Sequence, residues 1–186
     1  MLFIFSIQSE KTKLNNQVER ILEVASLNKD ALEIPVSTIE IKTVITKALS
    51  NLSLLIEKEE AVINTQIEEG ILVQGNAYHL ENVLVNLIEN GIKYSEGKAA
   101  ISITFSQAEN LAQIQVRDQG IGMTNDQQDK AFDNFYRVQS GNLHDTKGFG
   151  LGLSYSKLVI EKMNGSIQLS SKPGEGTTAT INLKLS

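Results

Sequence analysis

The stretch of sequence that decides the fold is Asn86-Leu87-Ile88-Glu89-Asn90-Gly91-Ile92-Lys93-Tyr94-Ser95. It closes a segment whose apolar residues recur every three or four positions, and this period predicts a helix over residues 77–94 with one buried face. The same helix has a second, polar face of asparagines and a lysine. Amide oxygens suit a magnesium ion that already holds phosphate oxygens, and lysine suits phosphate charge, so this polar face is a candidate ligand site. The apolar residues are Leu80, Val83, Leu84, Leu87 and Ile88, and the polar residues of the second face are Asn82, Asn86, Asn90 and Lys93.

The segments on both sides of this helix predict an α/β sandwich. Two long alternating runs, 100–106 and 111–118, are joined by a polar turn and predict a hairpin. Thr38 is a candidate cap for a helix over 39–58. The other predicted strands are 33–37, 61–67, 71–74, 166–171 and 178–185, and the other predicted helices are 126–132 and 151–163.

The N-terminal segment carries a separate helical pattern. Apolar residues over 4–25 step by three and four in a heptad seam that Lys11 interrupts, and such a stripe needs a partner helix. The turn-prone residues 28–30 predict a boundary near 28–33. The apolar start at 1–5 is far shorter than the ~20 residues that span a bilayer, so we expect a chain that is soluble as given.

Composition excludes several classes of function. A chain of 186 residues suits one domain with a short appendage. Its net charge of −5 argues against a non-specific nucleic-acid binder. It has no cysteine, which excludes disulfides, thiolate metal sites and cysteine nucleophiles, and its two histidines, His79 and His144, are too few for most zinc sites.

Two glycine-bearing loops add candidate binding groups. Residues 118–122, Asp-Gln-Gly-Ile-Gly, follow a predicted strand, so the backbone can approach a ligand while the carboxylate accepts a hydrogen bond from it. A plain turn that begins with Asp is the alternative for this loop. Residues 148–153, Gly-Phe-Gly-Leu-Gly-Leu, open a helix and present backbone amides to an anion. The sequence matches neither a Walker loop nor a dinucleotide-binding glycine motif.

Together these segments resemble the motifs of sensor histidine kinases. The asparagine box at 86–95 is followed in the family's order by the loop at 118–122, a phenylalanine box at 132–137, the glycine motif at 148–153 and Gly174-Glu175-Gly176-Thr177. The resemblance covers about residues 34–186. It implies the Bergerat ATP-binding fold, a two-layer α/β sandwich with a mixed, mostly antiparallel sheet and helices on one face, preceded here by an N-terminal helix.

The resemblance also implies roles for the residues that match the family's motifs. Asn90, assisted by Asn86, would coordinate Mg²⁺, and Asp118 would accept from the adenine amino group of ATP. The catalytic residues would be Asn90, Lys93 and Arg137. Residues 138–147 would form a lid over the nucleotide. The other positions implied to bind ATP are Tyr94, Gly120, Gly122, Lys147, Gly148, Gly150, Leu151, Gly152, Leu153, and Thr177 or Thr178. One departure is Gly91, where the family usually has alanine.

The asparagine box also separates two activities. Gyrase-type relatives carry a glutamate at the position of Asn86 as general base for water, whereas an amide cannot accept a proton at neutral pH. Glu89 lies about 100° round the helix from Asn90 and is not that base. We therefore expect a kinase that transfers the γ-phosphoryl group of ATP to histidine. The alternatives are a hydrolysing ATPase, an anti-sigma type serine kinase, and a non-catalytic ATP-binding interaction module.

The phosphoacceptor histidine of the family is not recognisable in this chain. It normally lies on the first helix of a dimerising hairpin, and residues 1–30 resemble part of the second helix, so we expect a fragment that lacks the acceptor. The partners implied are the parent's own dimerisation domain and the receiver domain of a response regulator, with no nucleic acid. A homodimer through the N-terminal helix is a further expectation. The resemblance also implies a cytoplasmic fragment of a membrane-anchored parent.

Overall fold

The computed structural model describes residues 33–108, 110–137 and 149–186. Some of the predictions therefore lie outside the described residues. These are the helix at 4–25 with the domain at 1–30, and the lid segment at 138–147 with Lys147 and Gly148.

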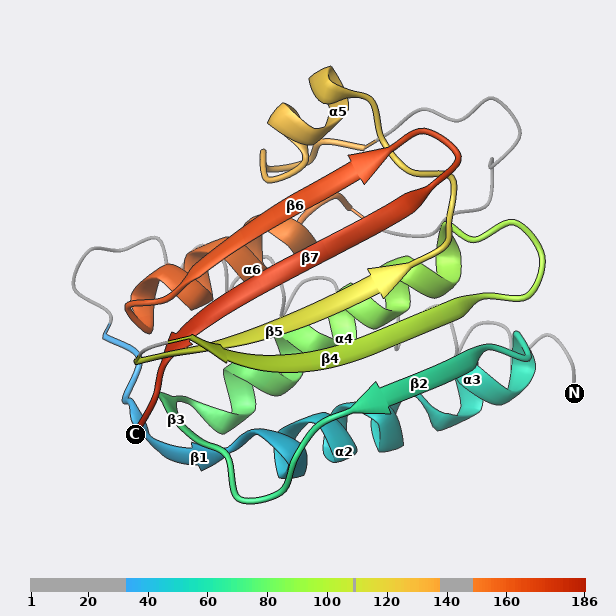
Figure 1. Ribbon diagram of the computed structural model, residues 1–186. Coiled ribbons are helices and arrows are strands. Elements are labelled where there is room, and N and C mark those ends of the chain that lie inside the picture. Colours follow the sequence, from blue (N-terminus) through green and yellow to red (C-terminus); the bar gives the residue numbers. More distant parts are fainter. Residues whose placement is uncertain (1–32, 109, 138–148) are drawn as a thin grey trace, which may run out of the picture.

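A five-stranded sheet forms one layer of the fold, with its strands in the order β2-β4-β5-β7-β6 (Figure 1). β2 pairs with β4 in parallel, and the other three pairings are antiparallel, which confirms the mixed, mostly antiparallel sheet. The strands are β2 (Val62–Gln66), β4 (Ala100–Ala108), β5 (Leu111–Asp118), β6 (Ser166–Lys172) and β7 (Gly176–Lys184).

A second, two-stranded sheet pairs β1 (Ser37–Glu40) with β3 (Leu72–Gly75) in antiparallel fashion. An isolated bridge between Val73 and Leu185 joins β3 to the chain just after β7.

Helices α2 (Ile41–Asn51), α4 (Ala77–Lys93) and α6 (Gly152–Lys162) cover one face of the large sheet (Figure 1). α4 lies in contact with both of the other long helices. It begins at Asn76, whose side chain accepts a hydrogen bond from the backbone N–H of His79 at 3.1 Å, as an N-cap should. The two short helices are α3 (Ser53–Lys58) and α5 (Asn125–Lys130).

The core lies between the sheet and these helices, because both layers are apolar on one side only. Every second residue of β4 and β5 faces the helices, and Ile101, Ile103 and Ile114 are at most 1% exposed. Their neighbours along the strands are mostly polar and face away, as a sheet with one solvated face requires. The predicted apolar face of α4 is confirmed, since Leu80, Val83, Leu84, Leu87 and Ile88 are all buried.

Three predictions in the first third of the domain were wrong in detail. The strand expected at 33–37 begins only at Ser37, after Pro35, which has no N–H to donate to a ladder. The helix expected at 39–58 is interrupted at Leu52, which ends α2 and precedes α3. Thr38 does not cap it, because Thr38 lies in β1 and its hydroxyl bonds to Ser186 at 2.6 Å.

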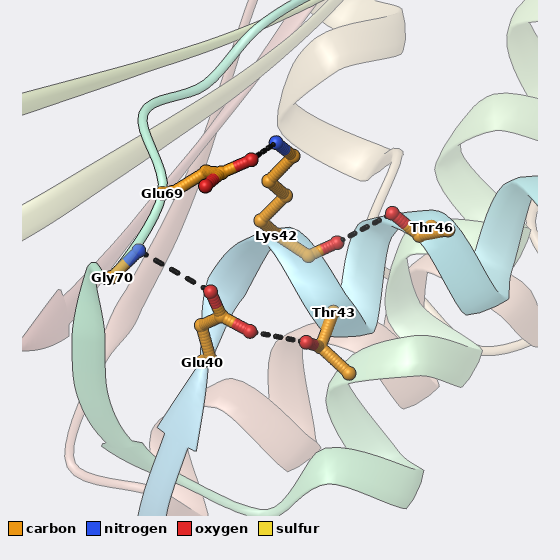
Figure 2. A network of polar contacts seen from close by, with 6 residues as sticks. All are labelled: Glu40, Lys42, Thr43, Thr46, Glu69 and Gly70. Atoms are coloured by element: carbon orange, nitrogen blue, oxygen red, sulfur yellow. Dashed lines mark hydrogen bonds and ion pairs between the residues drawn. The ribbon is translucent and has the colours of Figure 1, made fainter.

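Glu40 takes the place at the start of α2 that was predicted for Thr38. Figure 2 shows its carboxylate between the Thr43 hydroxyl and the backbone N–H of Gly70, while Lys42 pairs with Glu69. The hydrogen bond from Thr43, followed by the one from Gly70, holds the pKa of Glu40 below its ordinary value. These contacts tie the loop before β3 to the beginning of α2.

Candidate functional site

Three segments that are far apart in the sequence meet around the loop that follows β5. The carbonyl of Tyr94, at the end of α4, accepts a hydrogen bond from the N–H of Ile121 at 2.9 Å. The carbonyl of Ile121 in turn accepts from the N–H of Gly174, in the turn between β6 and β7, at 2.8 Å. The asparagine box, the loop at 118–122 and the turn at 174–177 are therefore joined by backbone hydrogen bonds.

Asp118 is the charged group at the centre of this site. Its Oδ1 accepts hydrogen bonds from the N–H of Gly120 at 2.9 Å and from the N–H of Thr177 at 3.0 Å. Within the described residues, Oδ2 accepts no hydrogen bond, and no buried side-chain oxygen lacks a partner, so Oδ2 is open to a ligand. Burial raises the pKa of Asp118, and the two backbone hydrogen bonds and Arg117 only partly offset this.

The glycines of the loop are required because the backbone passes so close to its neighbours. A Cβ on Gly120 would lie 2.5 Å from the carbonyl oxygen of Tyr94. Gly122 has a φ of +65°, and a Cβ there would lie 1.9 Å from the carbonyl oxygen of Lys172. Because both obstacles are backbone atoms, they cannot move aside, and a plain Asp-headed turn would not need two glycines.

A buried polar contact joins α4 to the N-terminal half of α6. Asn86 is 4% exposed and donates through Nδ2 to Ser156 Oγ at 3.1 Å. Ser156 is 0% exposed and its hydroxyl donates to the carbonyl of Gly152 at 2.9 Å. A Cβ on Gly152 would lie only 2.0 Å from Asn86 Oδ1, so glycine lets the two helices approach. Asn86, predicted to assist metal binding, thus lies in a packed contact between helices.

The other polar residues of α4 lie near its end. Lys93 Nζ forms an ion pair with Glu89 at 2.8 Å, one helical turn away, and both side chains are about 30% exposed. Glu89 therefore holds the Lys93 side chain at the site, and its own carboxylate is paired with the Lys93 ammonium group. Asn90 is partly buried, and its backbone carbonyl accepts from the N–H of Tyr94 at 2.9 Å.

The phenylalanine box lies against the glycine motif. The N–H of Phe135 donates to the carbonyl of Gly150 at 3.0 Å, and a Cβ on Gly150 would lie 2.5 Å from the carbonyl oxygen of Tyr136. Phe132 packs against the core, whereas Phe135 has a φ of +65° and is 64% exposed. The aromatic residue at 135 is thus a surface residue beside the glycine motif.

The remaining predicted residues lie apart from one another, in different surroundings. Arg137 is exposed directly before the segment that the structure does not describe. Leu151 is 5% exposed and Leu153 packs against the core, so their side chains serve packing. His79 lies in the first turn of α4, and its Nδ1 is 2.9 Å from the hydroxyl of Tyr155.

Three residues of the site were missed by the sequence analysis: Ser156, Ser171 and Gln128. Ser171 Oγ lies 2.9 Å from Thr177 Oγ1, and the Gln128 side chain bonds to the backbone of Ser171. Strand alternation could have placed Ser171 on the core-facing side of β6, but the register of β6 against β7 is what places it opposite Thr177.

Neither a metal cluster nor a membrane span is found in the part of the chain that the structure describes. No three His, Cys, Asp or Glu side chains gather there as a metal-binding group. Among the same residues, no helix has the length and apolar character needed to cross a bilayer.

Comparison with known proteins agrees with this geometry. The family model for histidine kinase-, DNA gyrase B-, and HSP90-like ATPases matches residues 75–186. The sensor protein RprX of Bacteroides fragilis is 32% identical over 183 residues, which are 96% of this chain and 35% of RprX, so the chain spans about a third of that relative's length.

Two solved structures show the same fold. The histidine kinase AdeS of Acinetobacter baumannii matches with a TM-score of 0.82 at 21% identity, over 99% of this chain and 84% of that one. Full-length ShkA, solved in complex with AMPPNP, matches with a TM-score of 0.85 at 19% identity, over 99% of this chain and 38% of that one. The predicted two-layer Bergerat fold is therefore confirmed. The chain belongs to the family of histidine kinase-, DNA gyrase B-, and HSP90-like ATPases, as an ATP-binding domain of the sensor histidine kinase type.

Proposed function

We propose that this domain binds ATP together with Mg²⁺ and transfers the γ-phosphoryl group to a histidine on another segment. The observation that carries the proposal is the carboxylate of Asp118, of which only one oxygen accepts hydrogen bonds. Two backbone donors fix Oδ1, and Oδ2 is left as a charged acceptor in a site that excludes water in part. The adenine amino group is a donor of the right kind for it.

The phosphate end of ATP would lie between the ends of α4 and α6. Gly150, just before α6, and Gly152, its first residue, offer backbone amides at the positive end of the helix dipole. Lys93 and Arg137, with Lys147 and Gly148 from the adjoining segment, would neutralise phosphate charge. Tyr94 would pack on adenine, with Thr177 or Thr178 in support.

Magnesium suits the candidate ligand atoms on α4, which are the neutral amide oxygens of asparagines and not a cluster of carboxylates. Such a set can hold an ion that takes most of its ligands from phosphate and water. Asn90, assisted by Asn86, would hold it, and the ion would neutralise charge on the transferring phosphoryl group. Because Asn86 is buried, its assistance would act largely through the contact with α6.

Transfer to histidine is favoured over hydrolysis because neither Asn86 nor Glu89, the two described positions beside Asn90, can serve as a base for water. An amide stands at Asn86, and Glu89 is paired with Lys93. In the proposed reaction, the bond between the γ-phosphorus and the bridging oxygen breaks, ADP keeps the electron pair, and a ring nitrogen of the histidine bonds to phosphorus. The domain's own residues align the two reactants and stabilise charge, which is most of what phosphoryl transfer needs.

The proposed protein partners follow from this reaction. They are a dimerising hairpin that carries the histidine and the receiver domain of a response regulator that takes the phosphoryl group next, within a membrane-anchored parent that holds this domain on its cytoplasmic side.

Calorimetric titration with ATP, with and without Mg²⁺, tests the proposal. We expect binding that Mg²⁺ strengthens, and we expect Asn90→Ala to remove this strengthening while the fold persists. Asn64→Ala, at an exposed asparagine on the edge strand β2, is the matched control. Absence of ATP binding by the folded wild type would overturn the proposal.

A further inference from the structure

Ser171 lies beside the candidate adenine site, although no predicted motif includes it. Its Oγ accepts a hydrogen bond from the N–H of Met123 at 2.8 Å and donates to the carbonyl of Gly176 at 2.8 Å. The same oxygen lies 2.9 Å from Thr177 Oγ1. One hydroxyl therefore contacts the end of the loop after β5, the first residue of β7, and the threonine whose N–H donates to Asp118.

The donors and acceptors around Ser171 determine where the hydroxyl protons lie. The N–H of Met123 can only donate, and the carbonyl of Gly176 can only accept. The single proton of Ser171 is used on Gly176, so all three contacts are hydrogen bonds only if Thr177 donates to Ser171. Thr177 Oγ1 then has only lone pairs left, and it is an acceptor toward any ligand.

Ser171 is held firmly enough to impose this arrangement. It lies near the end of β6, an edge strand of the sheet. The N–H of Ser171 donates to Gln128 Oε1 at 2.9 Å, and Gln128 Nε2 donates to the carbonyl of Ser171 at 2.9 Å. The side-chain amide of Gln128 thus supplies both hydrogen bonds that a further strand would have made.

We propose that Ser171 is a specificity-determining residue that selects adenine over guanine by holding the Thr177 hydroxyl as an acceptor. This inference rests on the proposed function. Thr177 also donates its backbone N–H to Asp118, so Thr177 Oγ1 and Asp118 Oδ2 are acceptors on neighbouring residues. Adenine presents an amino group there, whereas guanine presents a carbonyl oxygen that two acceptors repel. Ser171 acts through Thr177 and need not touch the base.

The experiment compares ATP and GTP affinities of Ser171→Ala by calorimetry. Without Ser171 the Thr177 hydroxyl can rotate and donate, so the ratio of ATP to GTP affinity should fall at least about fivefold, the value of one hydrogen bond. Loss of structure alone would weaken both nucleotides equally and leave the ratio unchanged. Ser170→Ala is the matched control, because Ser170 is exposed and lies on the opposite face of the same strand. Ser171→Thr, which keeps a hydroxyl, should restore the ratio.

A double-mutant cycle tests whether Ser171 works through Thr177. Thr177→Val keeps the backbone N–H but removes the hydroxyl, so adding Ser171→Ala to it should leave the ratio unchanged. A ratio within twofold of the wild type in folded Ser171→Ala, or full additivity in the cycle, would overturn this inference alone. Wild-type protein that binds neither nucleotide would overturn the proposed function as well.

Discussion

Replacing Asp118 with asparagine should convert the open acceptor of the site into a donor without unfolding the domain. The N–H groups of Gly120 and Thr177 both require an acceptor, so the amide oxygen of Asp118→Asn must take the place of Oδ1. Its NH₂ group then occupies the position of Oδ2 and faces the adenine amino group, donor against donor. Since burial raises the pKa of Asp118, removing the charge should leave stability at neutral pH unchanged or higher.

The size of the binding loss follows from the hydrogen bond that disappears. A hydrogen bond to a charged group contributes about 1.5–3 kcal/mol, which corresponds to a loss of about 10- to 150-fold in ATP affinity. GTP should lose much less or gain, because its carbonyl can accept from the new amide.

Calorimetry measures both affinities, and thermal unfolding measures stability. Asp129→Asn on α5, an exposed carboxylate outside the site, is the matched control. ATP affinity within about threefold of wild type in the folded variant would refute the role of Asp118, since even the weakest such bond is worth more than this.

Three further predictions concern the same site. Ser156→Ala leaves Asn86 Nδ2 buried without an acceptor and should lower the free energy of unfolding by about 1–3 kcal/mol in denaturant titration; no loss would show that the contact is dispensable. Gly152→Ala should cost about as much and weaken ATP binding, because its Cβ would lie 2.0 Å from Asn86 Oδ1. ATP affinity should fall as the pH drops through the raised pKa of Asp118, because protonation removes the charged acceptor. Folding stability should depend on pH in the opposite sense: the contribution of this carboxyl is complete below its ordinary pKa of 3.8 and is lost as the pH rises through its raised pKa. An affinity independent of pH over that range would contradict the first part.

Elements with a strong local pattern were predictable from the sequence. The helix predicted at 77–94 is α4, and the hairpin predicted at 100–118 is β4 and β5, because each pattern repeats often enough to fix one buried face. A sustained pattern was not always sufficient. The helix over 39–58 kept its apolar period through Leu52, and the periodicity alone could not show that the backbone leaves the helical conformation there.

The candidate site was predictable only as far as its motifs reach. Asp118 and its glycines follow a strand directly, so the sequence shows their chemistry. Ser156 and Ser171 gain their roles from partners 70 and 6 residues away, which become neighbours through helix packing and strand pairing. A serine in a helix or strand has no local signal that distinguishes such a role from an ordinary polar position.

Transfer of phosphate from ATP to a supplied histidine is the measurement that tests the account most directly. The chain is incubated with labelled ATP, Mg²⁺ and the histidine-bearing hairpin of its own parent, and the products are treated with acid and with base. We expect acid-labile, base-stable label on the hairpin, no label on the chain alone, and loss of transfer in Asn90→Ala. Steady ATP hydrolysis near ~1 s⁻¹, a typical enzyme rate, with no label on the hairpin would contradict the account.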